Sequence, residues 1–190
     1  MCRFLGVDGF DDMQVELEFV NPIGDVESIT VTYALLDGTG TRFSTHEERI
    51  QYPDADQSFR QESDTLTELP ATVNDVGVSC EVLEVAEGFA FGEAEAPADP
   101  TSCEFVEVDS FDDIQIELTV TSPFEDTTDV QATYALYADG VRFSSSVAII
   151  ELVAPGETVR SSQDTLTEPP AWSEPAALTC DVRAVEVIDF

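Results

Sequence analysis

The sequence contains no lysine, and its seven basic residues are all arginines, against 40 aspartates and glutamates. The formal net charge at pH 7 is therefore -33. Nucleic acids and anionic lipid surfaces bind proteins through Lys and Arg side chains that displace counterions, and an acidic surface repels them. The composition argues against DNA, RNA and acidic membranes as partners.

This charge has two possible origins. Strong salt shortens the Debye length to about 3 Å at 1 M and screens the repulsion between carboxylates. An acidic secreted protein from a GC-rich genome has the same composition. The sequence leaves both origins open.

Long apolar segments are also missing. No run of about 18 apolar residues occurs, so we expect no membrane insertion. The first predicted strand follows Met1 almost directly, without a charged segment and an apolar stretch before it. Either a signal segment was removed or the protein is cytosolic.

Groups for catalysis are scarce. The single histidine, His46, aligns with Ser146 in an internal repeat, so no duplicated catalytic role rests on it. A glycine-rich phosphate loop and a close Cys/His cluster are absent from the sequence. We expect no enzymatic activity and no cofactor.

The sequence contains an internal repeat of one module. Residues 2–12 return as 103–113, residues 33–35 as 134–136, and residues 64–68 as 164–168. Each half has the size of a small domain. We expect a first module over residues 1–89, an acidic linker rich in Ala, Pro and Glu over 90–101, and a second module over 102–190.

Both halves show the period-two alternation of half-buried strands. It is clearest in residues 13–19 and in their copy, 114–120. We predict six or seven strands per module; in the first module they cover residues 2–7, 13–19, 29–36, 42–50 and 57–64, with one or two more after residue 78. Strand length and turn spacing favour an all-β chain of two tandem immunoglobulin-like antiparallel β-sandwiches.

Four cysteines allow three pairings. Only Cys2 with Cys80 and Cys103 with Cys180 treats the two halves alike and lets each fold by itself. Stable disulfides indicate an oxidising environment, and hence a secreted or cell-surface protein. A cytosolic halophile protein with reduced thiols is the alternative.

Residues 33–38 and 134–140, together with the turn at residues 154–158, resemble the FxLYD modules of bacteria and archaea. In this sequence Tyr33 and Tyr134 stand in place of the Phe of that motif, and Leu36 stands in place of its Tyr. The resemblance implies an extracytoplasmic immunoglobulin-like fold without enzymatic activity.

Acidic residues recur in register before the second predicted strand of each half. Carboxylates in a loop are the ligands that Ca²⁺ prefers. Acidic residues before a strand are also ordinary turn formers. The candidate calcium ligands are Asp8, Asp11, Asp12, Asp109, Asp112 and Asp113.

Trp172 is the single tryptophan and has Thr72 as its counterpart in the first half. An exposed Trp can anchor a partner. The alternative is that its ring packs over the end of its own sandwich.

These features together predict a noncatalytic adhesion, recognition or spacer protein displayed at the cell surface. Its partner is an unidentified protein or glycan, and its oligomeric state is left open. The second hypothesis is a calcium-dependent binding module.

Overall fold

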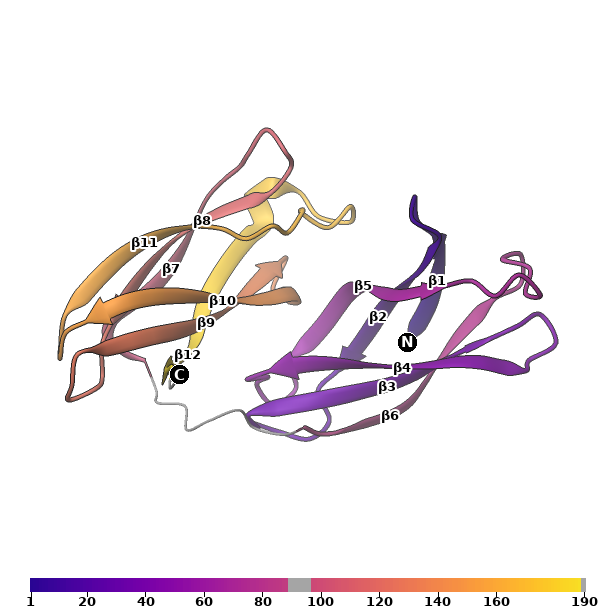
Figure 1. The fold of residues 1–190 in the computed structure, drawn as a ribbon, viewed down its shortest axis with the longest axis horizontal. Coiled ribbons are helices and arrows are strands. Elements are labelled where there is room, and N and C mark those ends of the chain that lie inside the picture. The colour runs from indigo at the N-terminus through magenta and orange to yellow at the C-terminus, as the bar shows by residue number, and fades with distance from the viewer. Residues whose placement is uncertain (89–96, 189–190) are drawn as a thin grey trace. The chain divides into compact units, whose positions relative to one another are not determined.

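The structure is a computed structural model, which describes residues 1–88 and 97–188. The chain divides into two compact units, Met1–Ala90 and Phe91–Phe190 (Figure 1). Both are built almost entirely from strands, and the one helical element among the described residues is the 3-10 turn η1 (Pro175–Ala177). The all-β prediction is confirmed.

The first unit has two three-stranded antiparallel sheets, in the orders β1-β2-β5 and β4-β3-β6 (Figure 1). Its strands are β1 (Cys2–Val7), β2 (Asp12–Val20), β3 (Ser28–Leu36), β4 (Arg42–Gln51), β5 (Ser58–Glu68) and β6 (Ser79–Glu87).

The second unit repeats this arrangement, with sheets in the orders β7-β8-β11 and β10-β9-β12. Its strands are β7 (Ala98–Val108), β8 (Ile114–Thr121), β9 (Thr128–Ala138), β10 (Val141–Val153), β11 (Thr158–Asp164) and β12 (Leu178–Val187).

The core of each unit lies between its two sheets. Alternate residues of the central strands are fully buried, as the period-two pattern predicts. In the first unit the buried cluster is Met13, Val15 and Leu17 from β2 with Val31, Tyr33 and Leu35 from β3. In the second unit Ile114, Ile116 and Leu118 of β8 belong to the equivalent cluster.

One disulfide joins the two sheets of each unit. Cys2 of β1 is bonded to Cys80 of β6, with Cα atoms 5.2 Å apart. Cys103 of β7 is bonded to Cys180 of β12, with Cα atoms 5.4 Å apart. This is the pairing that the repeat predicts, and it leaves no free cysteine.

Some strand ends differ from the expected ones. β5 continues to Glu68, past the expected end at residue 64: the strand is irregular at Leu66, whose φ is 49°, and pairs again at Asp12 and Glu68. β7 starts at Ala98, inside the stretch expected as linker. Residues 90–96 of that stretch lie outside the described residues.

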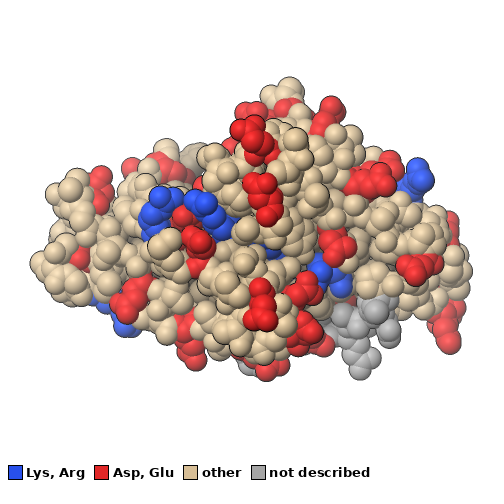
Figure 2. Space-filling view, turned by 180° about the vertical axis from the view of Figure 1, so that it is seen from behind, with Lys and Arg blue, Asp and Glu red and all other residues tan. Residues whose placement is uncertain are grey.

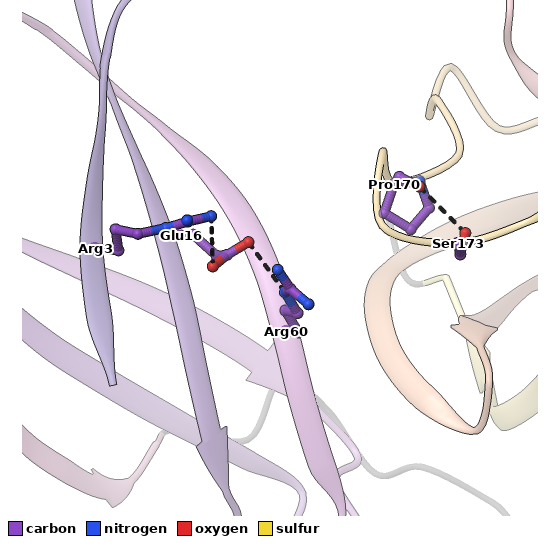
Figure 3. A network of polar contacts seen from close by, with 5 residues as sticks. All are labelled: Arg3, Glu16, Arg60, Pro170 and Ser173. Carbon is purple, nitrogen blue, oxygen red and sulfur yellow. Dashed lines mark hydrogen bonds and ion pairs between the residues drawn. The ribbon is translucent and has the colours of Figure 1, made fainter.

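The surface is strongly acidic, and Figure 2 shows red carboxylates spread over the visible face with few blue arginines. One carboxylate of the first unit is buried between two arginines. Glu16, only 4% exposed on the outer side of β2, pairs with Arg3 (Oε1 to Nη2, 3.0 Å) and Arg60 (Oε2 to Nε, 3.0 Å) (Figure 3). The counterpart Glu117 is 38% exposed and pairs with Arg160 at 3.6 Å.

Replacing Glu16→Gln should lower the free energy of unfolding by about 1–2 kcal/mol, because a buried charge-assisted pair is lost. Glu117→Gln is the matched control and should change it by less than about 0.5 kcal/mol, since exposed pairs contribute little. Urea unfolding of the full chain, followed through amide signals of β2 and β8, measures both. Equal effects of the two variants would contradict this assignment.

Candidate functional site

The loop between β1 and β2 is organised around Asp8. Its Oδ1 accepts hydrogen bonds from the backbone N–H of Phe10 (2.8 Å) and of Asp12 (3.0 Å). Its Oδ2 accepts from Gln14 Nε2 (3.5 Å), and Asp11 sits at φ 68°. Such an Asx turn explains why an acidic residue begins this loop.

The second unit repeats the loop bond for bond. Asp109 Oδ1 accepts from the N–H of Phe111 (2.8 Å) and of Asp113 (3.0 Å), and Oδ2 accepts from Gln115 Nε2 (3.4 Å). Asp112 has the same φ of 68°. The duplicated acidic residues therefore have a structural role in shaping both loops.

A third carboxylate joins each loop from the neighbouring strand. The register of β2 and β5 pairs Gln14 with Asp64 and so brings Asp64 beside the loop. Carboxylate oxygens of Asp8, Asp12 and Asp64 lie within 4.8 Å of one another. In the second unit the same holds for Asp109, Asp113 and Asp164. We call these two groups the carboxylate clusters.

Four of the six predicted calcium ligands thus belong to the carboxylate clusters. Asp11 and Asp112 do not. Asp64 and Asp164 were not among the predicted ligands, although they begin the five-residue stretch that is identical in both halves. That identity was the available signal.

The carboxylates of each cluster repel one another because they lie close together. The pKa of Asp12 is raised above its ordinary value of 3.8 by partial desolvation and by the negative charges of Asp64, Asp8, Glu68 and Asp11. The pKa of its counterpart Asp113 is raised by desolvation and by Asp164, Asp109, Glu168 and Asp112. A bound cation would relieve this repulsion.

Three carboxylates supply only part of the six to eight oxygens that Ca²⁺ takes, and water would supply the rest. Asp8 Oδ1 is already engaged by two backbone N–H groups. The arrangement can attract a divalent cation, but by itself it is not a complete calcium cage.

Exposed apolar side chains lie next to the clusters. Phe10 and Leu66 are 85% and 80% exposed, and their counterparts Phe111 and Leu166 are both 80% exposed. The two leucines have positive φ values of 49° and 50°. Each backbone N–H is held by the preceding aspartate, Asp64 Oδ1 to Leu66 at 2.8 Å and Asp164 Oδ1 to Leu166 at 3.1 Å.

Trp172 is half-buried and packs against the core cluster of the second unit. This position agrees with the second of the two roles that the sequence left open, in which the ring packs over the end of its own sandwich. Its counterpart Thr72 is exposed.

His46 lies on β4 with its Nε2 2.6 Å from Ser44 Oγ, and its ring stacks on Tyr33 at a centroid distance of 5.5 Å. Burial lowers the pKa of His46. These contacts belong to the edge of the first core, and the second unit has Ser146 at the same place.

In the described residues, helices of the length and apolarity needed to cross a membrane do not occur. Comparison of the sequence with protein-family models gives no match, and comparison with curated proteins gives no significant match.

Asp12→Asn should raise the melting temperature at pH 7 in dilute buffer. Because the pKa of Asp12 is higher in the folded state than the ordinary 3.8, ionisation of Asp12 destabilises the fold above that pKa. The gain should shrink as the pH falls through the folded-state pKa and should be absent below 3.8.

Thermal unfolding of the variant and the parent chain across this pH range tests the assignment. Asp11→Asn is the control. It removes one negative charge outside the cluster, at a positive φ that Asn tolerates, and should give a smaller gain in melting temperature. A gain for Asp12→Asn that persists unchanged at low pH would show that its cause is not the carboxylate charge.

Proposed function

We propose that the protein is a noncatalytic, exported element that binds or spaces partners at the cell surface and is built from two immunoglobulin-like modules. The observation that carries this proposal is the disulfide in each unit, which joins the first strand of one sheet to the last strand of the other. Such bonds persist in oxidising compartments and are rare in the cytosol.

The strand pairing supports the immunoglobulin-like assignment. The sheets β1-β2-β5 and β4-β3-β6 correspond to strands A-B-E and C′-C-F of such a sandwich. Here the disulfide links the strands in positions A and F, whereas antibody domains link B and F. We include in the proposal the relation to FxLYD modules, which the Tyr33 and Tyr134 segments support.

The absence of duplicated catalytic groups in the sequence supports a binding or spacing role. Both units have the same strand order and the same β1–β2 type of loop. They differ in the side chains around that loop. The proposed partner is a protein or glycan of the cell surface, and recovery of such a partner by pull-down with the intact chain tests the binding role.

Protein isolated from its own host should contain the bonds Cys2–Cys80 and Cys103–Cys180 and no free thiol. Peptide mapping of the nonreduced protein measures this. Reduction should lower the stability of each unit by about 2–4 kcal/mol in the chain-entropy view of long closed loops. Four free thiols would contradict export and favour the cytosolic halophile alternative.

The second candidate is a calcium-dependent binding module, and the duplicated carboxylate clusters are the observation that favours it. A ligand stabilises a protein by mass action only when it binds the folded form preferentially. A true site would therefore give saturable stabilisation at micromolar Ca²⁺, beyond that of NaCl at the same ionic strength.

For the noncatalytic binding or spacer protein we expect the melting temperature to rise with NaCl through screening of the carboxylates, with no extra effect of micromolar Ca²⁺. The double variant Asp64→Asn, Asp164→Asn removes one ligand from each cluster. If Ca²⁺ stabilises the parent chain saturably and fails to stabilise this variant, the calcium-dependent module replaces the first proposal.

A further inference from the structure

The first unit has a hollow beside its β1–β2 loop. It is open to solvent, has a volume of about 460 Å³, and lies against the segment that joins β5 to β6. Its lining includes the apolar residues Val7, Leu69 and Val73 and the carboxylates of Asp11, Glu68 and Asp75. We call it the β5–β6 hollow.

The equivalent segment of the second unit makes the same turn. The N–H of Val73 donates to Pro70 O at 2.8 Å, and the N–H of Ser173 donates to Pro170 O at 3.0 Å. Ser173 Oγ adds a hydrogen bond to Pro170 O at 3.2 Å (Figure 3). The residue just before Val73 or Ser173 therefore occupies one structural position, held by Thr72 in one unit and by Trp172 in the other.

The two residues at this position behave differently. Thr72 is exposed. Trp172 turns inward and packs against the second core, as does Val108, the counterpart of Val7. The position between Ala71 and Val73, two residues that line the β5–β6 hollow, thus has an exposed threonine in the first unit, and its counterpart in the second unit is an indole ring packed on the core.

The charges around the hollow indicate the charge of a molecule that would bind there. Asp11, Glu68 and Asp75 all line it, whereas the counterpart of Asp75 in the second unit is Pro175. Phe10, the residue next to Asp11, is 85% exposed, and an exposed aromatic ring can attract a cation. An acidic surface of this kind favours and steers a positively charged partner.

We propose that the β5–β6 hollow binds an aromatic side chain of a partner polypeptide that carries arginines or lysines next to it. The ring takes the place that Trp172 takes in the second unit, and the basic groups meet Asp11, Glu68 and Asp75. This inference deepens the binding role proposed above and rests on it.

The probe is a capped five-residue peptide with one tryptophan between two arginines, titrated into the full chain and followed by NMR and calorimetry. We expect one site per chain, with shifted amide signals for residues 69–75. Thr72→Trp places in the first unit the residue that the second unit has at this position. It should weaken binding by about tenfold or more, because a ring between the lining residues Ala71 and Val73 would compete for the hollow.

Thr72→Ser leaves the hollow open and should bind as the parent chain does. Asp75→Asn should weaken binding and reduce its dependence on salt, since it removes one contact between charges. Thr72 is exposed, so its replacement leaves the core intact, and amide dispersion verifies that each variant is folded.

Two results would overturn the inference. Equal binding of a peptide with alanine in place of tryptophan would show attraction by charge alone, and unchanged binding by Thr72→Trp would place the site elsewhere. The proposed function fails by a different result, namely free thiols in the native protein. A surface partner that binds the parent chain and Thr72→Trp equally would keep the binding role and reject the hollow.

Discussion

The stability of each unit depends on the burial of apolar side chains between its two sheets. This burial must outweigh the mutual repulsion of the carboxylates on the surface. In the first unit one buried cluster comes from β2 and β3, and a second adds Ile50 of β4 and Phe59 of β5. In the second unit residues of β10 and β12 are buried together with those of β8 and β9. A unit of this size buries a modest fraction of its surface, and small cores gain from a covalent cross-link. The disulfides provide it where the outermost strands of the two sheets meet, β1 with β6 and β7 with β12.

Much of this fold could be predicted from the sequence because its determinants are local or duplicated. Alternation over residues 13–19 identifies β2, since a strand with one buried face must alternate. The cysteine pairs follow from the requirement that two copies of one module fold alike.

The carboxylate clusters could be predicted only in part, because they depend on contacts between distant segments. Asp8 and Asp12 share one loop, and their proximity follows from sequence. Asp64 reaches them only through the register of β5 on β2. The burial of Glu16 likewise requires Arg3 from β1 and Arg60 from β5, which no local pattern reveals.

The two units share a strand order but differ in the side chains placed on it. The lengths of the loop hydrogen bonds of Asp8 and Asp109 agree within 0.1 Å, so the two loops have the same geometry. Other positions differ. The exposed Thr72 of the first unit corresponds to the half-buried Trp172 of the second, and the closely paired Glu16 corresponds to Glu117, whose ion pair is longer. These differences change what each unit presents to solvent. At one position the first unit has an exposed threonine and the second has a half-buried indole, which favours separate roles for the two surfaces in the proposed binding function.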